Sequence, residues 1–255
     1  QAPVKESSRE KETHGGQPKK GGGQTNGFCN CWIEPTSDYQ VAMGPNDDGS
    51  SGIIVLPFNF NLYGEQYNTC YINNNGNVSF VNPYGTYTAS GFPSADYKMT
   101  APFWADVDTR GDDGLGLNGG VVKYLVTNTA LYVNWVDVGY FPSKTDKHNT
   151  FQLIITDGTD PVIGVGNNVS FCYKDMQWTT GSASCFGGSE NPCTYNGQQY
   201  SCNDTQGLGW GFCGSPSTVG ANRGNGTDFI QFTRNDHPGA DYDGPFGGPD
   251  GVDWL

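Results

Sequence analysis

The pattern that most constrains this chain is a series of short segments in which apolar and polar residues alternate. In GIIVLPFNFNLYG (52–64), Phe58, Phe60 and Leu62 fall on one side of an extended chain, and asparagines fall on the other. A period of two residues is that of a β-strand and not of a helix. The segment therefore predicts a strand with one buried face.

Further segments of this kind follow, separated by Asn, Gly, Asp and Pro. TCYINNNGNVSFVN (69–82) predicts a hairpin, because Asn and Gly accept the positive φ of a tight turn. Other strands are predicted at 98–108, 119–127, 130–140, 150–158, 168–178 and 229–233. The segments 119–127 and 130–140 predict a second hairpin that turns at Asn128-Thr129, and 150–158 and 168–178 predict another pair. No amphipathic helical segment exceeds ten residues. We therefore expect an all-β fold, a sandwich or a barrel.

Eight cysteines predict disulfides and an oxidising, extracytoplasmic location. Residues 185–213 hold four of them and are too rich in Gly, Asn and Ser to be stabilised by burial alone. Zinc is the alternative, but no CxxC pair occurs and no histidine lies in this cluster. The sequence leaves the pairing open among Cys29, Cys31, Cys70, Cys172, Cys185, Cys193, Cys202 and Cys213.

Four N-x-S/T sequons fit an exported glycoprotein, provided that the source organism glycosylates asparagine. They begin at Asn77, Asn168, Asn203 and Asn225. No apolar run approaches 18 residues, so we expect no membrane span. The polar start at Gln1 suits a mature chain from which an export signal has been removed.

The net charge of −13 is unevenly distributed. Residues 1–27 hold five of the 13 basic and three of the 26 acidic residues, so the rest of the chain carries a net charge of −15. Such a surface repels nucleic acid and anionic lipid, and it favours cations such as calcium or basic partners. Solubility alone is the other interpretation.

Residues 1–27 contain too few apolar residues to offset the entropy of ordering them. We therefore expect an extended, polar N-terminal arm or linker. The remainder, 28–255, is expected to be a single domain with 185–213 as a Cys-rich insertion.

Several motifs, in order, resemble the nidogen-like (NIDO) extracellular domain. They are YINNNGNVSF (71–80), APFWADVDTR (101–110), NTFQLIITDG (149–158), SFCYKDMQW (170–178) and STVGANRGNGTDF (217–229). The resemblance covers roughly residues 38–235, and the ending resembles secreted bacterial members more than animal ones. It implies an antiparallel β-sandwich that serves as a non-enzymatic module of adhesion and matrix proteins. The Cys-rich insertion and the lack of neighbouring EGF-like or von Willebrand modules depart from the animal pattern.

The acidic stretch APFWADVDTRGDDG (101–114) is the clearest candidate for chemistry. Calcium prefers carboxylate, amide and carbonyl oxygens, so Asp106, Asp108 and Asp113 are candidate ligands. The spacing is not that of an EF-hand. A salt bridge between Asp108 and Arg110, or ordinary Asp-Gly turns, would explain the same residues. Other acidic loops hold Asp47, Asp48, Asp241, Asp243, Asp250 and Asp253.

Enzymatic chemistry is disfavoured. Asp106 and Asp108 would share one face of a strand, which gives only the short end of the carboxylate separations used in glycoside hydrolysis. No glutamate lies nearby, and no G-x-S-x-G motif occurs. Trp104, Trp135 and Trp178 lie in apolar strands and are expected to be core residues.

Two functions are consistent with these observations. The first is a secreted structural or adhesion protein that binds itself or other extracellular proteins. The arm of one copy would pair with an exposed sheet edge of the next, giving filaments or a surface layer. The alternative is a calcium-dependent carbohydrate-binding, lectin-like module, indicated by the acidic loops and the aromatic residues.

Overall fold

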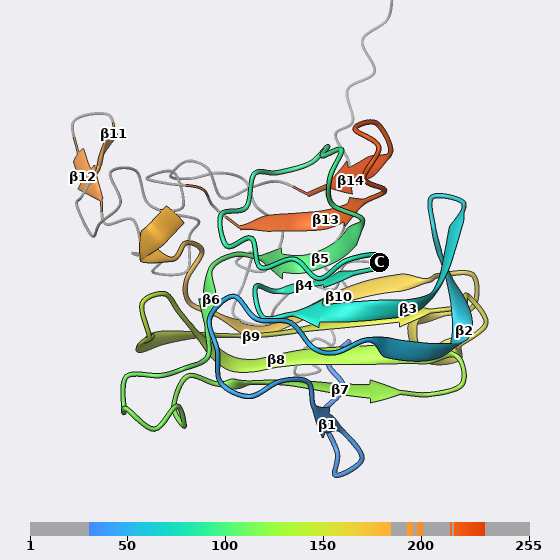
Figure 1. The fold of residues 1–255 in the computed structure, drawn as a ribbon, viewed down its shortest axis with the longest axis horizontal. Helices are drawn as coiled ribbons and strands as arrows, with labels where there is room; N and C mark the ends of the chain where they lie inside the picture. Colours follow the sequence, from blue (N-terminus) through green and yellow to red (C-terminus); the bar gives the residue numbers. More distant parts are fainter. Residues whose placement is uncertain (1–30, 185–192, 196–197, 201–214, 216, 233–255) are drawn as a thin grey trace, which may run out of the picture.

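The computed structural model describes residues 31–184, 193–195, 198–200, 215 and 217–232. Regular structure in these ranges is nearly all β-strand, with two 3-10 helices, η1 (Pro161–Ile163) and η2 (Ser182–Ser184). Every strand pair is antiparallel, and the strands form two large sheets (Figure 1). The prediction of an all-β antiparallel sandwich is confirmed.

Each large sheet has six strands. The first sheet has the order β1 (Gln40–Val41), β7 (Val121–Val126), β8 (Ala130–Tyr140), β9 (Lys144–Thr156) and β10 (Val169–Met176), with β6 (Val107–Asp108) also paired to β8. The second has the order β14 (Phe229–Gln231), β13 (Thr218–Asn222), β5 (Met99–Trp104), β4 (Asn77–Ser79), β3 (Glu65–Asn73) and β2 (Ile54–Leu62). Within 185–213, β11 (Cys193–Tyr195) pairs with β12 (Gln198–Tyr200).

The core lies between the two large sheets and follows from the alternation in the sequence. In β2, every second residue from Leu56 to Leu62 is buried, and the asparagines between them are exposed. Leu131, Val133 and Trp135 of β8 belong to the same core from the other sheet. Trp135 stacks on Phe151 of β9, with ring centroids 5.0 Å apart. Trp104, Trp135 and Trp178 are fully buried, as predicted.

The stretch 98–108 differs from the single strand that was predicted. β5 ends at Trp104 in the second sheet, and β6 begins at Val107 in the first sheet. Ala105 and Asp106 form the crossing between them. The loop from β1 to β2 also crosses between the two sheets.

A short strap, Cys31–Glu34, covers the outer face of the first sheet. Ile33 N donates to Gln152 Oε1 at 3.2 Å, and Ile33 O accepts from Gln152 Nε2 at 2.9 Å. Cys31 forms a disulfide with Cys172 of β10, with the Cα atoms 5.8 Å apart. The strap therefore satisfies polar groups that this face of the sheet would otherwise leave unpaired.

Cys70 corrects the prediction that all eight cysteines form disulfides. Its thiol is free and buried in the sandwich core. Burial raises the pKa of this thiol to about 12. The side chains of the other five predicted disulfide cysteines lie outside the described residues: Cys29, Cys185, Cys193, Cys202 and Cys213.

Candidate functional site

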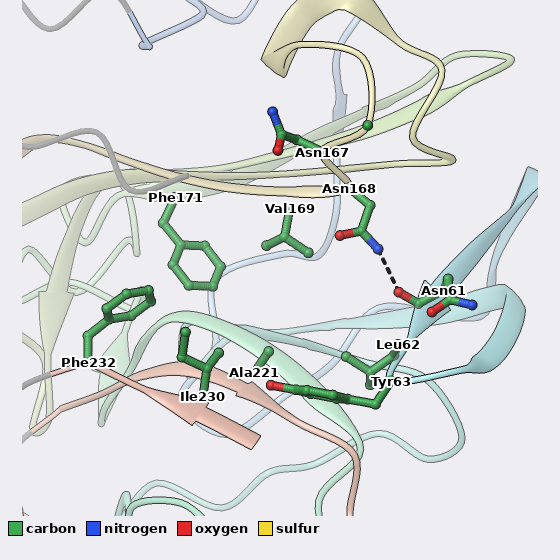
Figure 2. Close-up of a pocket in the computed structure, with 11 residues that line it drawn as sticks. Asn61, Leu62, Tyr63, Asn167, Asn168, Val169, Phe171, Ala221, Ile230 and Phe232 are labelled. Atoms are coloured by element: carbon green, nitrogen blue, oxygen red, sulfur yellow. Dashed lines mark hydrogen bonds between the residues drawn. The ribbon is translucent and has the colours of Figure 1, made fainter. Parts of the chain in front are cut away.

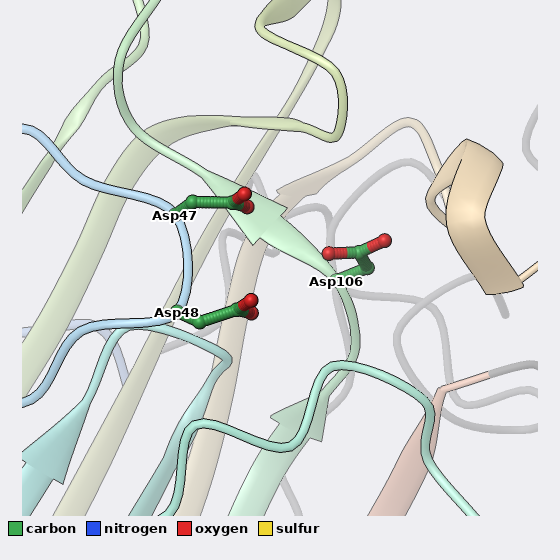
Figure 3. Close-up of side chains that lie close together, drawn as sticks. All are labelled: Asp47, Asp48 and Asp106. Atoms are coloured by element: carbon green, nitrogen blue, oxygen red, sulfur yellow. The ribbon is translucent and has the colours of Figure 1, made fainter.

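Three carboxyl groups meet where the chain crosses between the sheets. Asp47 and Asp48 lie in the loop between β1 and β2, and Asp106 lies in the crossing between β5 and β6. One carboxylate oxygen of each residue lies within 4.8 Å of the others. Figure 3 shows Asp47 and Asp48 extending from their loop toward Asp106. We call these three residues the acidic cluster.

Two asparagines of the β3–β4 turn hold the acidic cluster in place. Asn74 Nδ2 donates to the backbone oxygens of Asp47 and Val107, so it ties the loop to β6. Asn75 Nδ2 donates to Asp48 Oδ1 at 2.8 Å, while Asn75 Oδ1 accepts from Val107 N at 3.0 Å. Both asparagines are at most 1% exposed. The sequence predicted this turn but gave no sign that its amides reach the acidic loop.

The electrostatics of the acidic cluster are unfavourable as they stand. Asp106 is 2% exposed, and burial together with repulsion from Asp47 and Asp48 raises its pKa to about 8. Burial and repulsion from Asp108 and Asp48 raise the pKa of Asp47 to about 6. Asp106 Oδ2 and Asp47 Oδ1 are buried and have no hydrogen-bond partner among the described residues.

Asp108 has a different role from Asp106, although the two are close in sequence. Arg110 donates to it from Nε at 2.9 Å and from Nη2 at 2.6 Å. Although burial opposes ionisation, hydrogen bonds from Arg110 and Ser143 lower the pKa of Asp108. This is the salt bridge that the sequence allowed as an alternative to metal binding. Arg110 Nη2 also contacts Asp47 Oδ2 at 3.0 Å.

Asp113 is separate from the acidic cluster. It is exposed, and its Oδ1 accepts from the backbone N–H groups of Leu115 and Gly116, each at 2.8 Å. Of the three predicted ligands, only Asp106 belongs to the acidic cluster, with Asp47 and Asp48. The remaining candidates lie outside the described residues: Asp241, Asp243, Asp250 and Asp253.

A pocket of about 430 Å³ lies near the β2–β3 turn, between the end of β2, the start of β10 and the strands β13 and β14 (Figure 2). Its polar rim includes Asn61 and Asn168, which are joined by a 2.7 Å hydrogen bond from Asn168 Nδ2 to Asn61 O. Its apolar wall includes Phe171, Ile230 and Phe232. None of these residues was predicted as a binding residue, because they come from strands far apart in the sequence.

The sequons differ in accessibility. Asn77 is fully buried, and its side chain bonds to Asn73 and Asn75. Asn168 is partly buried at the pocket, and Asn225 is exposed in the turn before β14. Asn203 lies outside the described residues. Glycosylation at Asn77 is therefore incompatible with this fold, whereas the side chain of Asn225 is accessible to solvent.

Comparisons with known proteins find a matching family model and similar stretches in much larger proteins. A family model described as NIDO related matches residues 28–207. Nidogen of Drosophila melanogaster is 28% identical over 178 residues, which is 61% of this chain and 13% of nidogen. Alpha-tectorin of Gallus gallus is 33% identical over 159 residues, which is 54% of this chain and 7% of that protein.

Alpha-tectorin of Mus musculus is 35% identical over 159 residues, again 54% of this chain and 7% of the relative. The chain thus spans only a small part of these relatives. No solved structure matches it significantly. Among the described residues, no helix is long and apolar enough to cross a membrane.

Proposed function

Because this chain belongs to the NIDO-related family, we propose that it acts as a structural or adhesion module that binds extracellular proteins, including copies of itself. The family match carries this proposal, since it covers most of the double sheet and begins directly after the polar arm. Nidogen and alpha-tectorin are non-enzymatic matrix proteins. The chain is extracellular, and the Cys31–Cys172 disulfide agrees with that location.

The contact surface that we propose is the end of the second sheet at β14. This edge strand exposes Phe229 and Ile230, which are 39% and 48% exposed, and it adjoins the pocket. An edge strand presents unpaired backbone groups to which an extended segment can add. In our proposal, that segment is the polar arm (1–27) of a second copy.

Deletion of residues 1–27 tests this proposal. We expect the shortened chain to stay folded but to lose assembly, as measured by sedimentation velocity and electron microscopy. Ile230→Asp should have the same effect, because it places a charge on the proposed contact. Leu117→Asp is the matched control, since Leu117 is 76% exposed on a loop away from β14. Assembly that survives both the deletion and Ile230→Asp would contradict the proposal.

A carbohydrate-binding module is the second candidate, and the pocket favours it. Amide side chains at the rim and Tyr63 beside them are groups that bind sugars in other proteins. The pocket lining contains no member of the acidic cluster, so we expect a glycan in the pocket to bind in EDTA. Calcium-dependent binding would instead require the glycan to contact the acidic cluster. A glycan array with and without EDTA separates these cases, and no binding in either condition removes the candidate.

A further inference from the structure

The acidic cluster lies where two segments that cross between the sheets come together. The loop carrying Asp47 and Asp48 passes from the first sheet to the second, and the segment carrying Asp106 passes back from the second to the first. Their carboxylate oxygens lie within 4.8 Å of one another (Figure 3). Any group bound between them would therefore link both crossings.

The carboxyl group of Asp106 is the part that ordinary packing does not explain. The residue is 2% exposed, its carboxyl group lies next to Asp47 and Asp48, and its Oδ2 has no hydrogen-bond partner among the described residues. Burying an unpaired carboxyl group is costly, and such groups in folded proteins are normally paired or bound to metal. Oδ2 lies on the side of Gly181, where a Cβ would come within 2.4 Å of it. The glycine leaves this carboxyl group the room that a side chain would take.

The nearby positive charge does not neutralise the acidic cluster. Arg110 Nη2 contacts Asp47 Oδ2, but the same guanidinium forms a two-point pair with the fully buried Asp108. Asp47 Oδ1 remains buried without a partner. One guanidinium thus faces four carboxyl groups at this end of the molecule. A divalent cation would relieve that repulsion.

The donor set indicates which cation fits. The acidic cluster offers carboxylate oxygens, without the imidazole or thiolate that zinc prefers. Ca²⁺ takes six to eight oxygen ligands in flexible geometry, whereas Mg²⁺ demands a near-ideal octahedron and is usually held by only one or two carboxylates and water. Three carboxylates from two segments therefore suit Ca²⁺ better.

We propose that Asp47, Asp48 and Asp106 bind one Ca²⁺ ion between the two sheet crossings. Three carboxylates supply three or more of the six to eight oxygens that Ca²⁺ takes, and backbone carbonyls or water supply the rest. Asn74 and Asn75 act as positioning residues, because their amides bond to the loop, to β6 and to the Asp48 carboxylate. The bound ion would hold the two sheets in register at this end.

Calcium titration of the full 255-residue chain, stripped with EDTA, tests the proposal. By calorimetry we expect one ion per chain, with a Kd of about 10⁻⁴–10⁻³ M, the range of extracellular modules. The midpoint of thermal unfolding should rise with added Ca²⁺. Asp106→Asn should weaken Ca²⁺ binding at least tenfold, yet it should match or exceed the stability of the wild type without calcium, because it removes an unpaired buried carboxyl group.

Asp48→Asn gives an independent test at an exposed position, where loss of folding is not expected. Asp113→Asn makes the same charge change outside the acidic cluster and should keep the full Ca²⁺ response. The proposal is overturned if the wild type shows neither heat nor a thermal shift in about 10 mM CaCl₂. It is also overturned if Asp106→Asn and Asp48→Asn bind Ca²⁺ as well as Asp113→Asn does. Equal affinity for Mg²⁺ would overturn the choice of calcium.

Discussion

At Gly76 the backbone has a φ of +73°, and a Cβ there would lie 1.8 Å from the carbonyl oxygen of Phe103. The residue completes the turn whose asparagines, Asn74 and Asn75, reach the acidic loop. Only a residue without a side chain lets the turn approach β5 so closely. A single glycine therefore positions both the core hairpin and the candidate calcium site.

We predict that Gly76→Ala prevents folding or costs about 3 kcal/mol more than Gly64→Ala. Gly64 is the matched control, because its φ is +87° but a Cβ there would meet nothing within 4 Å. The control should cost only the left-handed backbone penalty of about 1–2 kcal/mol. Urea unfolding of both variants measures the difference. Equal losses of unfolding free energy in the two variants would show that the close approach to Phe103 does not destabilise Gly76→Ala.

The sequence predicted the strand and the turn of this region, but not which distant residues the fold brings into contact. The alternation around Phe58, Phe60 and Leu62 and the Asn-Gly turn were correct because each depends on neighbouring residues. The pairing of Asp106 with Asp47 and Asp48 depends on which strands become neighbours, and no local pattern encodes that. The sequence offered both metal binding and a salt bridge to Arg110 for Asp108, and only the fold shows that Arg110 pairs with it.

Among the elements, β3, β5 and β13 are joined at one end by an ionic network. Glu65 of β3 accepts from Lys98, which precedes β5, at 2.8 Å, and from Arg223, which follows β13, at 3.4 Å. Hydrogen bonds from Lys98 and Tyr67 lower the pKa of Glu65 to about 2. The network is partly exposed, so solvent screening weakens its contribution to stability.

We predict that this network makes stability depend on acid pH. Glu65 ionises near 4.5 when unfolded and near 2 when folded, so its contribution is complete above pH 4.5 and is lost as the pH falls toward 2. Glu65→Gln should be less stable than the wild type at pH 6, and the two should converge near pH 2. Urea unfolding at each pH measures this. Curves that stay parallel across that range would contradict the prediction.

The break between β5 and β6 is the element that sequence periodicity could not find. Residues 99–108 are all buried, so no alternation between buried and exposed positions marks where one strand ends and the next begins. The change of sheet becomes visible only when β6 pairs with β8. The pairing of β7 with β8 and of β9 with β10 was predicted, because strands that follow each other along the chain are often antiparallel neighbours. The pairing of β8 with β9 was not predicted.

For the whole molecule, the longest covalent constraint in the described residues is Cys31–Cys172, with a sequence separation of 141 residues. It fixes the strap across β8, β9 and β10, where Gln152 and Asn134 are fully buried. Without the strap, these two amides would lose their hydrogen bonds to Ile33. The sequence left the partner of Cys31 open.

We predict that Cys31→Ser lowers the free energy of unfolding by about 2–5 kcal/mol, because the long loop gains entropy in the unfolded chain. Cys172→Ser should cause a similar loss, and the double variant should lose no more than either single variant. Urea unfolding followed by tryptophan fluorescence measures all three. Additive losses in the double variant would show that the two residues act separately rather than through one bond.

The free thiol of Cys70 offers a practical consequence. Since it is sealed inside the sandwich, a thiol-alkylating reagent can modify it only when the sheets part. Mass spectrometry of the peptide carrying Cys70 would thus record how often the native interior opens. Comparing the alkylation rate with and without calcium would show whether the ion slows the opening of the two sheets.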